Sequence, residues 1–381
     1  MLTPTHRAWV SVDLEAIAYN IRQIVHHLGP HVALMAVVKA DAYGHGAVAV
    51  SEVALASGAK WLAVATIEEG IQLREADIKA PILLMGATNT PEEVEAVTYW
   101  KLQPTLCTPK QALTYSENLT HSHAIHLKID TGMSRLGTSW QEAVPFVEWV
   151  QSLPHLEIAS VYSHLATADE PDSAFLAIQK QRFDHVLEAL KLQPKRGQGP
   201  FLHLANSAGT LADPQYHYDL VRVGLALYGL APARHLQQVI DLKPALLIQA
   251  RITQVKTVPA GTGVSYGQTY HAKQDMRLAT VALGYADGLP RNLSGKIQVE
   301  VLGKRVPQVG TITMDQCLID VSAVPEVQEG EVVTFLGKSA PSAYDWADLL
   351  GTIPYEILCG FKHRLPRVVL KELIVPSERT P

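Results

Sequence analysis

The stretch Ala36-Val-Val-Lys-Ala-Asp-Ala-Tyr-Gly-His-Gly46 connects an apolar segment to a helix rich in alanine and valine. The apolar segment, residues 32–38, predicts a buried strand, and the helix is expected to begin near Ala47. Lys39 ends this strand, where loss of hydration disfavours the charged form of an amine. A neutral lysine amine forms Schiff bases with carbonyl compounds. Lys39 is therefore a candidate catalytic residue, and a salt-bridged structural lysine is the alternative.

Short β-rich segments recur through the first 230 residues and alternate with segments of helical periodicity. Strands are predicted at 32–38, 61–65, 81–85, 104–107, 124–129, 158–163, 201–205 and 220–223, and helices at 51–56, 67–76, 91–97, 141–153 and 172–192. Alternation of strands and helices is typical of a parallel sheet. Eight such units predict an α/β fold in which residues 1–240 form a (β/α)8 TIM-like barrel.

The pattern changes at about residue 241, after which long helical segments are nearly absent. Strands are predicted at 244–258, 276–283, 297–302, 305–309, 317–321 and 331–336, separated by turns of glycine, proline and aspartate, with one helix at 344–350. Such a series is typical of a mostly β domain, which we assign to residues 241–381. One more strand, at residues 8–12, precedes a helix at 14–25 and is compatible with either domain.

Composition and charge argue against several classes of protein. The 381 residues carry a net charge of -5 and no basic patch typical of proteins that bind nucleic acid or a membrane surface. No apolar run reaches the ~18 residues of a membrane-spanning helix, and charges near the start of the chain argue against a secretory signal. The three cysteines, Cys107, Cys317 and Cys359, lack the spacing of a disulfide framework or a zinc site. We expect reduced thiols, a cytoplasmic protein and no metal.

Chemically useful residues stand at the ends of five of the eight predicted barrel strands. These are Lys39, then Lys128 and Asp130, then His164, then Asn206 and Ser207, then Arg222 and Gly224. Active sites in this fold lie where the strands end. Packing alone does not explain five such positions at one mouth of a barrel, so the sequence predicts an active site there.

Two glycine-containing segments after the last barrel strands are candidates for binding phosphate. Asn206-Ser-Ala-Gly209 follows the seventh strand, and Val223-Gly-Leu225 closes the eighth, where barrels often hold phosphate on backbone N–H groups. A helix-starting turn is the alternative for the first segment. Tyr43 could reach the same phosphate or be a rim residue. Arg222 is only a donor, so beside a pyridine nitrogen it would oppose protonation of that nitrogen, and a buried ion pair is the alternative.

Lys128 lies between apolar neighbours in a predicted strand. Because Leu127 and Ile129 alternate with it, Lys128 is expected to point into the barrel if they face the helices. Arg135 stands in the following turn, and two cations without a carboxylate between them repel each other. A bound phosphate or a carbamate on Lys128 would supply the missing anion, and pairing with Asp130 is the plain alternative.

Three loops of the second domain are rich in glycine, tyrosine and other polar residues. They are Gly261–Tyr270, which contains Tyr266, Gly284–Arg291, which contains Tyr285, and Gly310–Cys317, which contains Met314. Each alone fits a β-turn or an interface loop.

In this order and combination the segments resemble the alanine racemase family, from Trp9-Val-Ser-Val-Asp-Leu14 to Arg364-Leu-Pro-Arg367. The resemblance implies that Lys39 holds pyridoxal 5'-phosphate and is the base on one face of the substrate. Tyr266, from the second subunit of a homodimer, would be the base on the other face. The expected cofactor-binding residues are Lys39, Tyr43, Arg135, His164, Asn206, Ser207, Arg222, Gly224, Leu225 and Tyr355.

The resemblance also assigns roles around the substrate. Arg135 and Met314 would bind alanine, Tyr285 and Tyr355 would narrow the entrance, and Lys128 matches a position that is often carbamylated. The chain departs from the family's frequent residues at Val223, Gln268 and Thr313, none of which is a catalytic side chain. These departures put the shape of the entrance and the rate in question more than the activity.

The implied reaction is the interconversion of L-alanine and D-alanine, which supplies D-alanine for peptidoglycan. A racemase of broader specificity that also accepts serine is the alternative. A non-catalytic pyridoxal-phosphate carrier on such a barrel would lack the second domain. A fold-related decarboxylase would have glutamate in place of Arg222 and would lack the Tyr266 loop. A structural module, in which the residues of the barrel mouth only pair with one another, is the remaining alternative.

Overall fold

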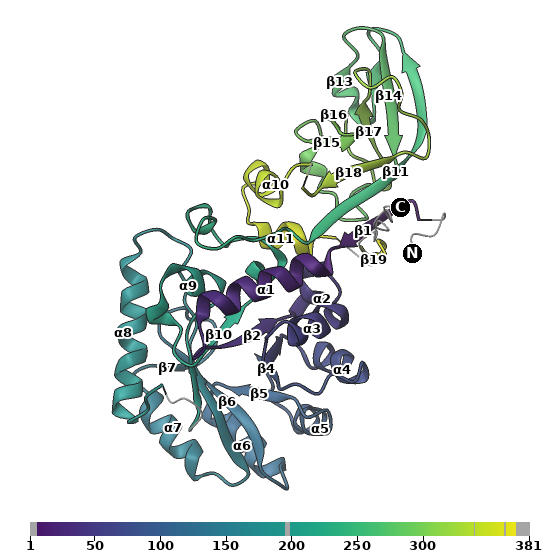
Figure 1. The fold of residues 1–381 in the computed structure, drawn as a ribbon. Helices are drawn as coiled ribbons and strands as arrows, with labels where there is room; N and C mark the ends of the chain where they lie inside the picture. Colours follow the sequence, from purple (N-terminus) through teal and green to yellow (C-terminus); the bar gives the residue numbers. More distant parts are fainter. Residues whose placement is uncertain (1–5, 195–198, 339, 362, 371–381) are drawn as a thin grey trace, which may run out of the picture. The chain divides into compact units, whose positions relative to one another are not determined.

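The computed structural model describes residues 6–194, 199–338, 340–361 and 363–370 (Figure 1). The chain divides into two compact units. Ala16–Lys243 forms one of them, and the other combines the described residues up to Glu15 with those from Pro244 onward. None of the helices in the described part of the chain is both long and apolar enough to cross a membrane.

Eight parallel strands form the sheet of the first unit. They are β2 (Ala33–Val37), β3 (Trp61–Val64), β4 (Ile82–Ala87), β5 (Gln103–Leu106), β6 (His123–Asp130), β8 (Leu156–Tyr162), β9 (Phe201–His203) and β10 (Leu220–Val223), in the order β10-β2-β3-β4-β5-β6-β8-β9. Backbone bonds from Asp219 N–H to Leu202 O and from Arg222 N–H to Ala205 O, each 3.0 Å, connect the two ends of this order. The sheet therefore closes, and the predicted barrel is confirmed.

Helices lie on the outside of this sheet (Figure 1). They are α1 (Leu14–Leu28), the short α2 (Lys39–Gly44), α3 (Ala47–Ala56), α4 (Ile67–Glu75), α5 (Pro91–Tyr99), α6 (Pro109–Asn118), α7 (Ala143–Ser152), α8 (Ala174–Ala189) and α9 (Ser207–Ala212), with 3-10 turns at η1 (Pro214–Tyr216), η2 (Leu225–Tyr228) and η3 (Arg234–Leu236). The helix α6 was not among those named from the sequence, although Thr108 caps it and Pro109 occupies its first turn. A two-residue strand, β7 (Thr138–Ser139), pairs with β6 beside the main sheet.

The second unit is mostly β, as predicted, and most of its strands pair antiparallel. Its sheet contains β1 (Ala8–Val12), β11 (Leu246–Val258), β14 (Met276–Val281), β15 (Gln298–Val301), β16 (Lys304–Val309), β17 (Cys317–Asp320), β18 (Val332–Leu336) and β19 (Arg367–Val369). Because β11 pairs with both β18 and β14, six of these strands form a closed ring. A hairpin of β12 (Gly263–Val264) and β13 (Tyr270–His271) carries η4 (Tyr266–Gln268), and η5 (Arg291–Leu293), α10 (Ala343–Leu350) and α11 (Pro354–Cys359) complete the unit.

The first strand of the chain belongs to the β-rich unit. All five residues of β1 are buried, and the strand pairs antiparallel with β11 and parallel with β19. The first compact unit therefore spans 16–243, whereas the predicted barrel range, 1–240, included this strand. An apolar strand of five residues fits any sheet, and its partner is fixed by a register with residues 246–250 that lie far away in the sequence.

Candidate active site

Lys39 follows β2 and opens a turn with an unusual backbone. The next four residues, Ala40–Tyr43, have φ between 52° and 55° and ψ between 37° and 49°, which is the left-handed helical region. For residues other than glycine this conformation costs roughly 1–2 kcal/mol each. The N–H of Ala42 donates to Val38 O (2.8 Å), and the Asp41 carboxylate accepts the N–H of Ala47 (2.8 Å). Specific hydrogen bonds thus hold a strained turn immediately after the candidate lysine.

The hydroxyl of Tyr43 lies against the backbone of Gly224. A Cβ atom at position 224 would be 2.5 Å from the Tyr43 hydroxyl oxygen, so any larger residue there would displace the Tyr43 phenol. The ring of Tyr43 packs on Tyr228, with 4.9 Å between centroids, and the Tyr228 hydroxyl donates to Val37 O (2.9 Å). This packing fixes the buried Tyr43 beside the end of β10.

Ser207 meets the same glycine. Its hydroxyl oxygen accepts the N–H of Gly224 at 2.9 Å, and both residues are at the ends of the late strands where phosphate binding was predicted. Asn206 caps α9 by accepting the N–H of Gly209 (2.9 Å), so the helix-starting turn considered for this segment is present. Leu225 follows Gly224 and begins η2. Two hydroxyl groups and a backbone N–H therefore gather at one point of the barrel mouth.

Arg222 is buried at the end of β10 and donates only to neutral acceptors. These are His203 Nδ1 (2.8 Å), Ser163 O (2.8 Å), His164 Nδ1 (3.1 Å) and Leu204 O (3.1 Å). No ion pair within the described ranges includes Arg222, so the interpretation as a buried ion pair is not supported. Among the hydrogen bonds that Arg222 makes to described residues, none comes from its Nε–H. Burial lowers the pKa of Arg222 to about 10, and the side chain stays cationic at neutral pH.

A chain of hydrogen bonds with a fixed direction extends from Arg222 across the barrel interior. Because arginine only donates, His203 Nδ1 is unprotonated and its Nε2–H donates to Ser160 Oγ at 2.8 Å. The Ser160 hydroxyl then donates to His126 Nδ1 (2.6 Å), whose Nε2–H donates to Gln103 Oε1 (3.0 Å). Burial lowers the pKa of both histidines, to about 3 for His126, so both rings are neutral. This series of hydrogen bonds keeps the Nδ1 atom of His203 as an acceptor for Arg222.

His164 follows β8, and the cations of the site lower its pKa. Its Nδ1 accepts from Arg222, so the neutral ring carries its proton on Nε2. Burial lowers the pKa of His164 well below its ordinary value, and positive charge adds to this shift, in decreasing order from Arg222, Lys128, Arg135 and Lys39. The ends of β2, β6, β8 and β10 and the turn after β6 therefore converge on one region, as the barrel predicted.

Lys128 is buried inside the barrel. Its Nζ lies 5.6 Å from the centre of the Tyr162 ring, and the Arg222 guanidinium lies 5.0 Å from the same centre. These cations come from β6 and β10, which are not neighbours in the sheet, so they meet in the interior. Burial, Arg222 and Arg135 lower the pKa of Lys128 to about 8, against weaker opposition from Cys107 and Asp130.

The charge of Asp130 acts weakly on Lys128, but its carboxylate is engaged elsewhere. Its Oδ1 accepts the N–H groups of Gly132 (2.9 Å) and Ser134 (3.0 Å) and shapes the turn that carries Arg135. Of the ion pairs in the described parts of the chain, none joins Asp130 to Lys128 or Arg135. The two cations share a region without a bound carboxylate, which leaves phosphate and carbamate as the alternatives.

Replacement of Lys128 by methionine is expected to stabilise the cofactor-free protein at neutral pH. Wild-type Lys128 loses its proton at about pH 8 when folded and at 10.5 when unfolded, so wild-type stability rises with pH across that window. In CO2-free buffer the advantage of Lys128→Met should be on the order of 3 kcal/mol at neutral pH and should shrink toward pH 10.5. Urea unfolding at several pH values measures it, with exposed Lys60→Met as control. A pH-independent difference would contradict the lowered pKa.

Tyr266 lies at the tip of the β12–β13 hairpin in the β-rich unit, with 73% of its surface exposed. Its backbone oxygen accepts the Thr311 hydroxyl (2.9 Å), and the hydroxyl of Ser265, which has a φ of 65°, donates to Thr311 O (2.6 Å). The phenol is therefore presented to solvent from a backbone that is held in place on both sides.

Tyr285 and Met314 are carried by loops that bind each other. The N–H of Tyr285 donates to Thr313 O, and the N–H of Ala286 donates to Met314 O, both at 3.0 Å. A Cβ atom at Gly284 would be 2.3 Å from Met314 O, so this contact requires glycine. Both side chains are exposed, Tyr285 by 42% and Met314 by 54%.

The segment 311–314 thus connects the Tyr266 hairpin to the Tyr285 loop. The predicted residues form two groups, one in each unit. The barrel group is Lys39, Tyr43, Lys128, Arg135, His164, Asn206, Ser207, Arg222, Gly224 and Leu225. The second group is Tyr266, Tyr285 and Met314, and Tyr355 lies half-buried on α11 of the same unit.

Several residues beside the barrel group were not predicted. They are Gln103, Thr105, His126, Ser160, Tyr162 and His203. The Tyr162 ring stacks on His203 with 4.7 Å between centroids, and its hydroxyl is 2.8 Å from the Thr105 hydroxyl. The alternation that places Lys128 inside the barrel also applies to His126, two residues earlier, and was the available signal.

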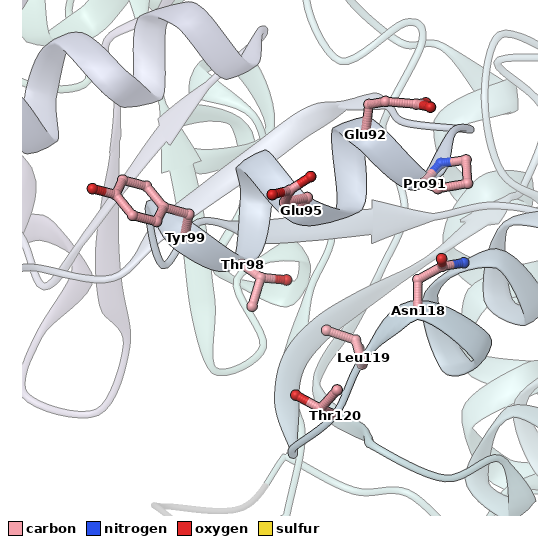
Figure 2. A pocket seen from close by; sticks show the side chains of 8 residues that line it. All are labelled: Pro91, Glu92, Glu95, Thr98, Tyr99, Asn118, Leu119 and Thr120. Carbon is pink, nitrogen blue, oxygen red and sulfur yellow. The ribbon is translucent and has the colours of Figure 1, made fainter.

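A surface hollow lies away from the barrel group, along the outer side of α5 and the end of α6 (Figure 2). It is lined by Pro91, Glu92, Glu95, Thr98, Tyr99, Asn118, Leu119 and Thr120, none of which was predicted for the site. Within the described residues, no cluster of histidine, cysteine, aspartate and glutamate is arranged to hold a metal ion.

Two family models match this chain. One, described as "Alanine racemase, N-terminal domain", matches residues 12–232, and the other, described as "Alanine racemase, C-terminal domain", matches residues 245–369. The chain belongs to the alanine racemase family. Within this family, the alanine racemase of Nostoc sp. strain PCC 7120 is 59% identical over 372 residues, which cover 96% of this chain and 96% of that protein.

Another alanine racemase, from Synechocystis sp. strain PCC 6803, is 54% identical over 370 residues, covering 96% of this chain and 99% of the relative. Among solved structures, the alanine racemase of Bacillus anthracis with bound L-Ala-P superposes with a TM-score of 0.88 at 37% identity, covering 96% of each chain. The likeness to alanine racemases therefore extends through both units.

Proposed function

We propose that this protein interconverts L-alanine and D-alanine by a two-base reaction that uses pyridoxal 5'-phosphate. The observation that carries the proposal is the grouping of residues at the barrel mouth. There, Lys39, the donor Arg222 and the cluster of Tyr43, Ser207 and Gly224 are positioned at the ends of β2, β9 and β10. Membership of the alanine racemase family supports the choice of reaction.

The residues of the barrel mouth fit this cofactor. The Lys39 amine offers a covalent attachment point for an aldehyde. The Tyr43 and Ser207 hydroxyls, the backbone at Leu225 and the cap residue Asn206 offer donors for the phosphate. The Gly224 N–H donates to Ser207 Oγ and so leaves the Ser207 proton for the phosphate. Tyr355 is proposed as a further phosphate ligand. The Nε–H of Arg222, which donates to no described residue, suits an acceptor such as a neutral ring nitrogen, and His164 lies next to Arg222.

Racemisation needs a proton removed from one face of the α-carbon and another returned to the opposite face. When bound, pyridoxal phosphate supplies a conjugated ring that stabilises negative charge on that carbon. The Lys39 amine serves one face, and the Tyr266 phenol serves the other. Two bases avoid the swing that a single base would make across the plane, and each positioned base contributes ~10²–10⁴-fold.

Tyr266 is proposed to come from the partner subunit of a homodimer. Support comes from its high exposure at a hairpin tip whose backbone is held by Thr311. The backbone N–H of Met314, on the connected loop, is proposed to bind the substrate carboxylate. Tyr285 and Tyr355 are proposed to narrow the entrance and so to favour a small side chain such as that of alanine.

Arg222 is proposed to suppress side reactions. Since it only donates, it would favour an unprotonated ring nitrogen, and the ring would then withdraw electrons only weakly from the substrate. Arg222→Glu is expected to raise the fraction of turnovers that end in pyruvate and pyridoxamine phosphate. Both products can be quantified during reaction with L-alanine. Equal product ratios in variant and wild type would contradict this role.

Lys128 is proposed to be carbamylated. A neutral amine attacks CO2, forms the N–C bond and releases one proton, and the pKa of about 8 makes this form accessible near neutral pH. The carbamate would turn a cation into an anion next to Arg222 and Arg135, the two guanidinium groups that lower its pKa. It would then orient Arg135 toward the cofactor and the substrate.

The cellular setting is also a proposal. The described residues contain three free cysteines, two of them buried, which fits a reducing cytoplasm. The reaction would supply D-alanine for peptidoglycan. The broader alternative, a racemase of alanine and serine, would need a pocket with room for the serine hydroxyl.

Purified protein loaded with pyridoxal phosphate tests the proposal. It is expected to bring L-alanine and D-alanine to equal concentrations from either side, as measured by chiral chromatography. The same assay with L-serine separates the strict enzyme from the broader one. Loaded protein that leaves both alanine enantiomers unchanged would overturn the proposed function.

A further inference from the structure

Glu69 connects the turn after Lys39 to the start of α4. Its Oε1 accepts the N–H of Ala40, the residue immediately after Lys39, at 2.7 Å. Its Oε2 accepts the N–H of Ala65 (2.7 Å) and of Thr66 (3.2 Å). One carboxylate therefore ties the end of β2 to the end of β3, and each of its oxygens serves a different strand end.

The hydrogen bond of the Ala40 N–H holds the start of this turn. Ala40 is the first of the four left-handed residues, and no side chain caps the turn from its own N-cap position, Val38. A charged acceptor makes a stronger hydrogen bond to a backbone N–H than a neutral one does. The Glu69 side chain itself is half-buried. The bond fixes the backbone next to Lys39 and hence the direction from which the Lys39 side chain leaves it.

The chain contains a close match to Glu69 that lacks this connection. α4 and α5 both begin with a capping box, formed by Thr66 with Glu69 and by Thr90 with Glu93. Glu93 Oε2 accepts the N–H groups of Asn89 (2.6 Å) and Thr90 (3.0 Å), both at the start of its own helix. Of these two glutamates, Glu69 alone also accepts a hydrogen bond from the end of a different strand, at Ala40. The two glutamates share the capping role and differ in the contact with Ala40.

We propose that Glu69 is a positioning residue for Lys39. Through Ala40 it holds the left-handed turn, so that the amine faces the barrel mouth in one direction. The inference rests on the proposed function, since Lys39 must be the residue that takes the aldehyde. Glu69 touches neither substrate nor cofactor, and its effect passes through the backbone of one neighbouring residue.

Three variants separate positioning from capping: Glu69→Ala, Glu69→Gln and Glu93→Ala. Glu69→Ala and Glu93→Ala should lower the melting temperature by similar amounts, because each loses one capping box. Addition of pyridoxal phosphate to the cofactor-free protein, followed by absorbance, should be ~10-fold slower or weaker in Glu69→Ala and near wild type in Glu93→Ala. Glu69→Gln keeps a single acceptor oxygen and should fall between them.

Borohydride trapping with peptide mass spectrometry provides a second readout, because it reports the share of cofactor fixed on Lys39. This share should fall in Glu69→Ala and stay unchanged in Glu93→Ala. If the two alanine variants attach the cofactor alike, the positioning role is wrong while the proposed function stands. If Glu69→Ala does not fold, Glu69→Gln decides, and attachment at the wild-type rate would overturn the role. A wild-type protein that binds no cofactor would overturn the proposed function and this inference together.

Discussion

Lys39→Ala is expected to reduce racemisation by ~10⁴-fold or more, because the variant loses both the covalent link to the cofactor and one of the two bases. The side chain stands at the end of β2 on a turn whose backbone is held in a strained conformation. Lys128 is the one other predicted site residue with a primary amine, and it is buried beside Arg222 and Tyr162. Chiral chromatography of alanine measures the loss.

The control for this variant is Lys60→Ala, an exposed lysine just before β3. It should keep wild-type activity. Borohydride reduction should add the mass of the cofactor to the Lys39 peptide in wild type and in Lys60→Ala, and to no peptide in Lys39→Ala. Retention of more than a tenth of wild-type turnover by Lys39→Ala would show that another group does this work.

Tyr266→Phe is expected to reduce racemisation by ~10²–10⁴-fold while cofactor binding persists. The substitution removes one oxygen from an exposed ring. It leaves untouched the two bonds that hold the loop to Thr311, from the Ser265 hydroxyl to Thr311 O and from the Thr311 hydroxyl to Tyr266 O. Because the Lys39 amine still serves its own face, one alanine enantiomer should continue to exchange its α-proton with D2O. Exchange of the other enantiomer should be lost, which NMR of the α-hydrogen detects.

Tyr270→Phe is the matched control, since Tyr270 belongs to the same hairpin and its ring packs on an apolar cluster of the β-rich unit. It should leave both exchange rates near wild type. Equal loss of exchange from the two enantiomers in Tyr266→Phe would argue against a base that is specific to one face.

Much of the barrel can be predicted from the sequence because its strands are buried on both sides. A parallel strand covered by helices is apolar throughout, as residues 33–37 and 61–64 are, and the polar residue that follows it then marks the barrel mouth. Lys39, His164 and Arg222 could be placed in this way. Their convergence is a property of the closed sheet, which needs only the count and order of the strands.

The turn after Lys39 could not be predicted. Its four left-handed residues, Ala40–Tyr43, include no glycine, and alanine is a strong former of right-handed helices. The conformation depends on acceptors that lie outside the turn, among them Glu69 from another strand end. The first strand, β1, is a similar case, because its partner β11 lies more than 230 residues away.

The hydrogen-bond chain behind Arg222 was missed for a different reason. His126 could be found by the alternation that placed Lys128. Ser160 and His203 come from two further strands, and their meeting with His126 depends on the register between β6, β8 and β9. No short segment determines the register of a parallel sheet, so a single sequence does not show which interior side chains are in contact.

The proposed racemisation depends on an amine from one chain and a phenol from its partner acting on the same α-carbon. A mixture of the inactive Lys39→Ala and Tyr266→Phe proteins, exchanged into mixed dimers, tests this directly. A mixed dimer has one site with both defects and one with none, so random assortment predicts recovery of about a quarter of wild-type activity. If the mixture stays as inactive as its two parents although mixed dimers have formed, the two groups do not meet across subunits and the account is contradicted.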